Sequence, residues 1–124
     1  MQLSEHFSLA ELTVSEIAAR KGLDNLPEGV ALENLSRLAE KLEEVRKVIG
    51  KPIMINSAYR SPEVNSAVGG VKTSQHCFGC AADIRVPGMT PDEVVKAIIA
   101  SKIQYDQLIR EFDSWTHISI PNTA

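Results

Sequence analysis

Residues 74–83 read Ser-Gln-His-Cys-Phe-Gly-Cys-Ala-Ala-Asp and place a histidine and an aspartate seven residues apart. His76 precedes Gly79, in a segment typical of a turn. Residues 82–86, Ala-Asp-Ile-Arg-Val, alternate as a strand does, so the isoleucine and valine face one side and Asp83 faces the other. Because the turn leads directly into this strand, we expect it to fold His76 back over Asp83.

A second short strand, near the C-terminus, contains another histidine. In residues 115–120, Trp-Thr-His-Ile-Ser-Ile, the threonine and both isoleucines share one face, while the tryptophan, His117 and the serine share the other. Two such strands would bury their isoleucines on one side and present Asp83 and His117 on the opposite side. With His76 added, two imidazoles and one carboxylate form a three-ligand set for one catalytic zinc ion per chain, with the fourth position left for water or substrate.

These motifs resemble a known family. The pattern Ser-x-His-x-x-Gly-x-Ala-x-Asp, followed by Trp-x-His-x-Ser, is similar to that of the M15 zinc D-Ala-D-Ala peptidases, a group that includes vancomycin-resistance dipeptidases, phage endolysins and, by fold, the Hedgehog signalling domain. Residues 57–61, Ser-Ala-Tyr-Arg-Ser, resemble the family's Tyr-Arg segment. The resemblance covers roughly residues 52–120, and it implies that His76, Asp83 and His117 are the zinc ligands.

A zinc peptidase also needs a carboxylate that takes a proton from water and passes it to the leaving amine. Many M15 members have a glutamate three residues before the last histidine, where this chain has Ser114. Hedgehog-type members have one six residues before it, where Glu111 stands. If residues 112–114 form a three-residue hairpin loop, Glu111 shares the face of His117, whereas a two-residue loop would turn it away. We therefore expect Glu111 to be the base, with Asp113 as the alternative.

The resemblance implies substrate-binding roles for further residues. Arg60 matches an arginine that helps to bind substrate and stabilises the oxyanion on the scissile carbonyl; a surface salt bridge is the alternative. Ser74 matches a serine that binds the substrate's terminal carboxylate in the dipeptidases; a loop-stabilising hydroxyl is the alternative. Trp115 and Ser119 are candidates to line the cleft, and Trp115 could equally cap the core.

The remaining sequence predicts an α+β domain with a small, mostly antiparallel sheet flanked by helices. Apolar residues at three- and four-residue steps predict a long amphipathic helix over residues 30–49, and its charged face is expected to be solvated. Shorter helices are expected at residues 8–12, 16–21, 61–68 and 90–101, and strands at residues 52–58, 82–86, 104–111 and 115–120. The resemblance implies a Hedgehog/DD-peptidase-like fold, in a single peptidase domain spanning residues 1–124.

Composition narrows the class of function. The net charge is −3 and 23% of the residues are charged, so no basic excess indicates nucleic-acid binding. No apolar run has the length of a membrane span. The first residues, Met-Gln-Leu-Ser-Glu-His-Phe, lack the basic and apolar regions of a secretory signal. The expectation is therefore synthesis in the cytoplasm and release to the cell wall by another factor, as for a phage-encoded protein. A monomer is expected as well.

Three further residues that could bind a metal, two cysteines and one histidine, lie outside the zinc pattern. Cys77 and Cys80 form a Cys-x-x-Cys, which could be half a zinc site or a redox pair, but two reduced thiols packed beside the site are expected. His6 has no partner in the pattern and is expected to be a partly exposed histidine.

Together these features predict a zinc metallopeptidase that hydrolyses peptidoglycan stem peptides or other D-amino-acid-containing peptides. A carboxypeptidase and an endopeptidase, or a phage lysin and a bacterial enzyme, are not separated by the sequence. The alternative is a zinc-stabilised binding module without turnover, as in Hedgehog, and Ser114 is its main support. A metal-free interaction domain is a weaker alternative.

Overall fold

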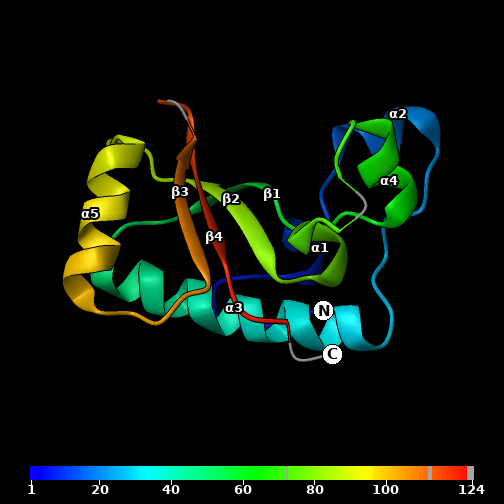
Figure 1. The fold of residues 1–124 in the computed structure, drawn as a ribbon. Coiled ribbons are helices and arrows are strands. Elements are labelled where there is room, and N and C mark those ends of the chain that lie inside the picture. The colour runs from blue at the N-terminus through cyan, green and yellow to red at the C-terminus, as the bar shows by residue number, and fades with distance from the viewer. Residues whose placement is uncertain (72, 112, 123–124) are drawn as a thin grey trace.

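A four-stranded antiparallel sheet lies at the centre of the computed structural model, which describes residues 1–71, 73–111 and 113–122 (Figure 1). The strands lie side by side in the order β1-β2-β4-β3. They are β1 (Met54–Ser57), β2 (Ala81–Arg85), β3 (Gln107–Glu111) and β4 (Trp115–Ser119). The predicted α+β class with a small antiparallel sheet is confirmed.

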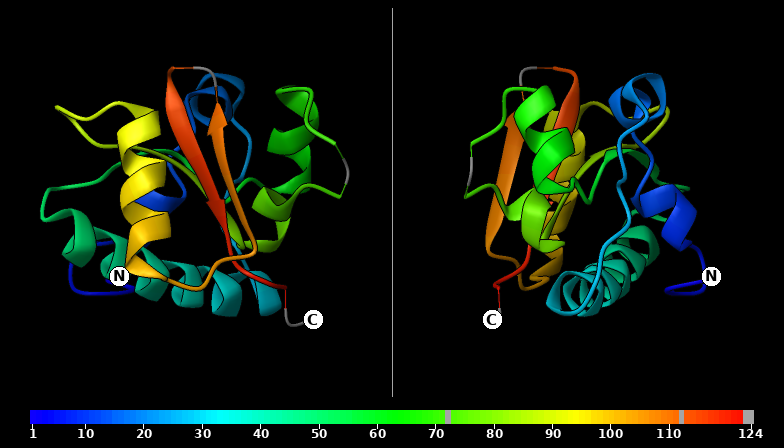
Figure 2. Two further views of the ribbon diagram at one scale, coloured as in Figure 1. Left: turned by 60° about the vertical axis from the view of Figure 1, so that its left-hand side comes forward. Right: turned by 90° about the vertical axis from the view of Figure 1, so that its right-hand side faces the viewer.

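Helices surround the sheet. Within the described ranges they are α1 (Leu9–Leu12), α2 (Glu16–Lys21), α3 (Val30–Ile49), α4 (Pro62–Ala67), the 3₁₀ helix η1 (Gln75–Phe78) and α5 (Pro91–Ser101). The long helix α3 runs beneath the strands, and α2 and α4 lie together at one end of the molecule (Figure 1). In the left view of Figure 2, α5 and α4 flank the β3–β4 hairpin from opposite sides. None of the helices in the described ranges is both long and apolar enough to cross a bilayer.

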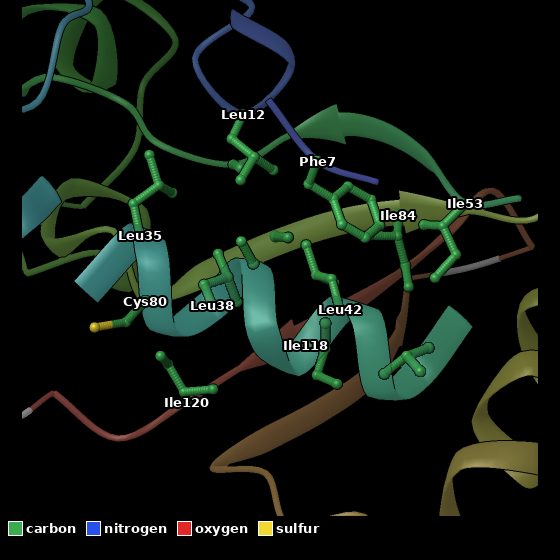
Figure 3. Packing of buried hydrophobic residues seen from close by; sticks show 14 of the residues in the cluster. Phe7, Leu12, Leu35, Leu38, Leu42, Ile53, Cys80, Ile84, Ile118 and Ile120 are labelled. Atoms are coloured by element: carbon green, nitrogen blue, oxygen red, sulfur yellow. The ribbon is translucent and has the colours of Figure 1, made fainter. Parts of the chain in front are cut away.

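The hydrophobic core lies between α3 and one face of the sheet. Leu38 and Leu42 of α3 pack against the same cluster as Ile84 of β2 and Ile118 of β4, with Phe7 closing it from the N-terminal segment (Figure 3). All five side chains are fully buried, and each contributes roughly 1.5–3 kcal/mol of hydrophobic stabilisation. The predicted division of the strand faces is therefore confirmed, since both isoleucines are on the core side.

Local signals placed the helix starts correctly. Ser8 and Thr90 each accept a hydrogen bond at the start of a helix and complete a capping box with the glutamate three residues later. Ser15 and Ser61 cap α2 and α4 in the same way, without the second half of the box. Side-chain capping thus offsets part of the cost of the unpaired N–H groups at these ends.

The limits of several elements differ from the prediction. Residues 75–78 form η1 where only a turn was expected, with Ser74 as its N-cap, because a single 3₁₀ turn has no hydrophobic period to detect. β3 begins at Gln107 rather than at residue 104, since α5 ends in a left-handed Lys102 and a loop follows. β1 begins at Met54, two residues after Pro52, which has no N–H for the ladder.

The turn that follows η1 is pressed against α3. Gly79 has φ of 76°, and a Cβ at this position would lie 2.3 Å from the backbone oxygen of Ala31. On the same side, Asn34 Nδ2 donates to the carbonyl oxygen of Phe78 at 3.0 Å. Both contacts fix the backbone immediately after His76 onto the helix.

We therefore expect Gly79→Ala to destabilise the fold more than Gly22→Ala does. Both glycines are left-handed, which costs about 1–2 kcal/mol for alanine, but a Cβ at Gly22 meets nothing within 4 Å. Only the first change adds a backbone clash, typically worth about 1–3 kcal/mol more. Urea denaturation of the two variants measures the difference, and equal losses of unfolding free energy would contradict the close packing described here.

Candidate metal centre

Three side chains converge on the sheet face that is turned away from the core. Asp83 of β2 lies directly opposite His117 of β4, and His117 Nδ1 donates to Asp83 Oδ1 at 2.8 Å. His76 reaches the same carboxylate from η1, with its Nε2 3.4 Å from Asp83 Oδ2. One ligand atom from each of the three residues lies within 4.8 Å of the others. The structure thus brings together the three residues that the sequence predicts as metal ligands, and His76 folds back over Asp83 as expected.

The strand register determines this meeting. Ile84 and Ile118, next to Asp83 and His117 in their strands, are completely buried in the core. Because successive side chains of a strand point to opposite faces, this burial forces the aspartate and the histidine onto the other face. A slip of one residue in either strand would bury Asp83 or His117 and expose an isoleucine, so the hydrophobic core excludes that slip.

The orientation of His76 is set by a backbone carbonyl. Its Nδ1 lies 2.6 Å from the oxygen of Ala58, which can only accept a hydrogen bond. In the neutral imidazole the proton therefore stays on Nδ1, and the lone pair of Nε2 faces Asp83 Oδ2. Such a carbonyl partner is common behind metal-bound histidines. Two acceptor atoms that face each other are suited to a cation between them, so the donor set fits zinc.

Asp83 is ionised at neutral pH despite being largely buried. Burial raises the pKa of its carboxyl group, but hydrogen bonds from His117 and His76, and the positive charge of these imidazoles in their protonated form, lower the pKa by more, to a net value of about 2. A carboxylate must be deprotonated to bind a metal. The site therefore already has the charge that a divalent cation requires.

Arg60 and Ser74 both adjoin η1. Arg60 Nη2 donates to Ser74 Oγ at 3.3 Å, and the same hydroxyl oxygen accepts from the backbone N–H of His76 at 3.3 Å. Among the described residues, Arg60 forms no salt bridge, and its buried Nε has no partner. The surface salt bridge given above as its alternative is therefore not formed with any of them. Ser74 stabilises the start of η1. Its contact with substrate stays a prediction.

Glu111 lies on the same sheet face as the metal cluster. It pairs with Trp115, while Ile109 pairs with His117. Glu111 is thus the diagonal neighbour of His117, a relation that typically places the two residues about 7–8 Å apart. Three residues separate the pair that closes the hairpin, as the orientation of Glu111 requires; Phe112, one of them, lies outside the described residues.

Asp113, the alternative base, lies away from the metal cluster. It is exposed and lines a cavity of about 210 Å³ together with Ile84, Thr116 and Val94 of α5, which are all on the core side of the sheet. The half-buried Trp115 borders the same cavity and also stands opposite Glu111.

One candidate for the cleft wall is corrected. Ser119 is fully buried, and its hydroxyl accepts from the N–H of Gln107 at 3.0 Å and lies 3.4 Å from Asp106 Oδ2. It therefore stabilises the start of β3 and does not line an open cleft.

The remaining histidine and the two cysteines do not belong to the metal cluster. His6 lies outside the metal cluster and is exposed, as expected, and its Nδ1 lies 2.6 Å from Glu43 Oε1. Both cysteines are free, and burial raises the pKa of the Cys77 and Cys80 thiols. A raised pKa leaves little thiolate at neutral pH, which disfavours a redox pair and agrees with two reduced thiols.

Sequence reasoning missed the groups that support the ligands from behind. Gln75 Nε2 donates to Asp106 Oδ2 at 2.5 Å and thereby connects η1 to the residue before β3. Asn34, a buried polar residue on the apolar side of α3, bonds the last residue of η1. An asparagine within a run of leucines at helical spacing is the one signal that could have pointed to such a role.

Comparison with known proteins agrees with this geometry. The zinc D-Ala-D-Ala carboxypeptidase of Streptomyces albus G is 47% identical over 45 residues, which are 36% of this chain and 18% of that protein. The similarity thus spans less than a fifth of the relative's length. The model of the Peptidase M15 family matches residues 5–119, a range that includes all three metal-binding candidates. As the sequence motifs predicted, the chain belongs to the peptidase M15 family.

Proposed function

We propose that this chain is a zinc metallopeptidase that hydrolyses peptide bonds in peptidoglycan stem peptides or related peptides containing D-amino acids. The observation behind this proposal is the cluster of His76, Asp83 and His117, with its ionised carboxylate and pre-oriented imidazole. Membership of a peptidase family supports peptide hydrolysis in general. The name of the partly matching relative, a D-Ala-D-Ala carboxypeptidase, supports the cell-wall substrate.

Each residue around the cluster has a role in this proposal. His76, Asp83 and His117 would hold zinc, which would supply Lewis-acid chemistry and make a water molecule easier to deprotonate. Glu111 accepts a proton from the attacking water and later delivers it to the leaving nitrogen. The Arg60 guanidinium, whose Nε has no hydrogen-bond partner in the part of the chain that the structure describes, binds the negative charge that develops on the scissile carbonyl oxygen. Ser74 orients this guanidinium and contributes to binding the substrate's carboxylate.

A non-catalytic zinc module of the same fold is the second candidate, and Ser114 favours it. A serine hydroxyl is too weak a base to replace the glutamate that many members have at this position. The position of Glu111 on the face of His117 weighs against this candidate, because it offers a carboxylate at the proper side of the sheet.

The zinc assignment predicts the metal content of the purified protein. We expect about one zinc per chain, and loss of most of it in Asp83→Ala, because the change removes one of three protein ligands. Elemental analysis after dialysis measures the content, with Glu111→Gln as a control that should stay loaded. Full occupancy in both His76→Ala and His117→Ala would rule out this metal centre.

The catalytic assignment predicts which carboxylate matters. Wild-type protein incubated with purified peptidoglycan should release short peptides or single D-amino acids, identified by mass spectrometry. Glu111→Gln should retain zinc and fold but lose nearly all hydrolysis, because glutamine accepts no proton. Asp113→Asn should retain most of it.

The contrary outcomes are distinct. Loss of activity in Asp113→Asn alone would move the role of the base to that residue. Full activity in both variants would place the base elsewhere. No release by the zinc-loaded wild type, across stem peptides and intact wall, would favour the non-catalytic module.

A further inference from the structure

We infer that Asn25, in the loop between α2 and α3, is a positioning residue that sets the location of Arg60 and the orientation of His76. The part of this inference that concerns Arg60 rests on the proposed function, whereas the part that concerns His76 rests on the metal cluster. Asn25 belongs to neither the zinc motif nor the Tyr-Arg segment, and it precedes Arg60 by thirty-five positions.

The Asn25 side chain is buried, with 8% of the residue exposed, and all of its polar groups are used. Nδ2 donates to the carbonyl oxygens of Thr13 at 2.8 Å and Tyr59 at 3.1 Å, and Oδ1 accepts from the N–H of Ser61 at 2.7 Å. These partners define the rotation of the amide, because a flipped amide would place its oxygen against two carbonyl oxygens.

Two of the three bonds hold the backbone on either side of Arg60. The carbonyl of Tyr59 belongs to the peptide plane before the Cα of Arg60, and the N–H of Ser61 belongs to the plane after it. Since peptide groups are planar, only the φ and ψ angles of Arg60 lie between these two planes. One amide side chain therefore fixes the backbone conformation from which the guanidinium extends.

The same segment determines how His76 lies. The N–H of Arg60, in the first of those planes, donates to the carbonyl oxygen of His76 at 3.1 Å. The preceding plane contains the carbonyl of Ala58, which binds His76 Nδ1 at 2.6 Å, and the N–H of Tyr59, which donates to Leu12 at 2.9 Å. Arg60 and His76 would thus move together if the segment shifted.

Arg60 needs this support because its side chain makes few hydrogen bonds of its own. Within the described residues, its guanidinium makes one hydrogen bond, to Ser74 at 3.3 Å, and Nε has none. A long side chain with a single hydrogen bond depends strongly on its backbone for placement. Asparagine suits the supporting position, because it offers two donors and one acceptor on one rigid group, whereas aspartate would set a charged oxygen against the Thr13 and Tyr59 carbonyls.

A double-mutant cycle tests the link to Arg60. Asn25→Ala should lower kcat/KM on a wall-derived peptide by about 10-fold or more, because small displacements of a catalytic group reduce the rate strongly. In the Arg60→Ala background, the same change should lower kcat/KM by less than about 2-fold, since the guanidinium that it positions is gone. Equal factors in both backgrounds would overturn the inference for Arg60. All assays use enough zinc to load every variant.

A second measurement does not depend on hydrolysis. Asn25→Ala should raise the zinc dissociation constant by about 10-fold, the usual scale for loss of a group behind a metal ligand, as measured by competition with a chromophoric chelator. Hydrogen exchange should also show faster exchange of the Ser61 amide. An unchanged zinc affinity would overturn the inference for His76.

The controls separate positioning from loss of stability. Ile98→Ala removes a fully buried side chain of α5 and should lower the midpoint of unfolding without changing kcat/KM or zinc affinity. If Asn25→Ala does not fold, Asn25→Ser takes its place, because its single short hydroxyl adds no charge and cannot bond the Tyr59 carbonyl and the Ser61 N–H together as the amide does. A wild type that hydrolyses nothing, with the zinc effect of Asn25→Ala intact, would refute the proposed function and the part of the inference that concerns Arg60, and would support the part that concerns His76. An Asn25 variant that matches Ile98→Ala in both assays would refute the positioning role alone.

Discussion

The pairing of Asp83 with His117 across β2 and β4 is the constraint on which the site depends. It depends on the core, because Ile84 and Ile118 are buried on the opposite face and a slip of one residue would expose one of them. The burial of these two isoleucines therefore aligns Asp83 with His117. The third candidate ligand, His76, joins from outside the sheet, and the hydrogen bond to the Ala58 carbonyl orients its ring.

Much of this arrangement follows from short-range sequence patterns. Alternation in the segments around Asp83 and His117 predicts which side chains share a face, and capping residues such as Ser8 and Thr90 predict where helices begin. The limits of the strands were less certain, because they depend on which backbone groups find partners. The 3₁₀ turn that holds His76 had no periodic signal at all.

The supporting contacts could not be predicted, for a different physical reason. The pairs Asn25–Ser61, Asn34–Phe78 and Gln75–Asp106 join residues that lie between 31 and 44 positions apart. Each is a single hydrogen bond to a backbone group or a short polar side chain, so neither partner leaves a pattern in its own neighbourhood. The ligands themselves were found because their spacing is repeated in a family, and their supports have no such motif.

These supports connect the first third of the chain to the metal cluster, although it contains none of the three candidate ligands. From one side, α3 fixes the turn after His76 through Asn34 and through the close approach at Gly79. From the other side, the loop before α3 holds the segment of Arg60 through Asn25. The sheet alone would align two ligands and leave the third on an unsupported turn. The helical portion and the sheet must therefore pack correctly against each other before a three-ligand centre exists.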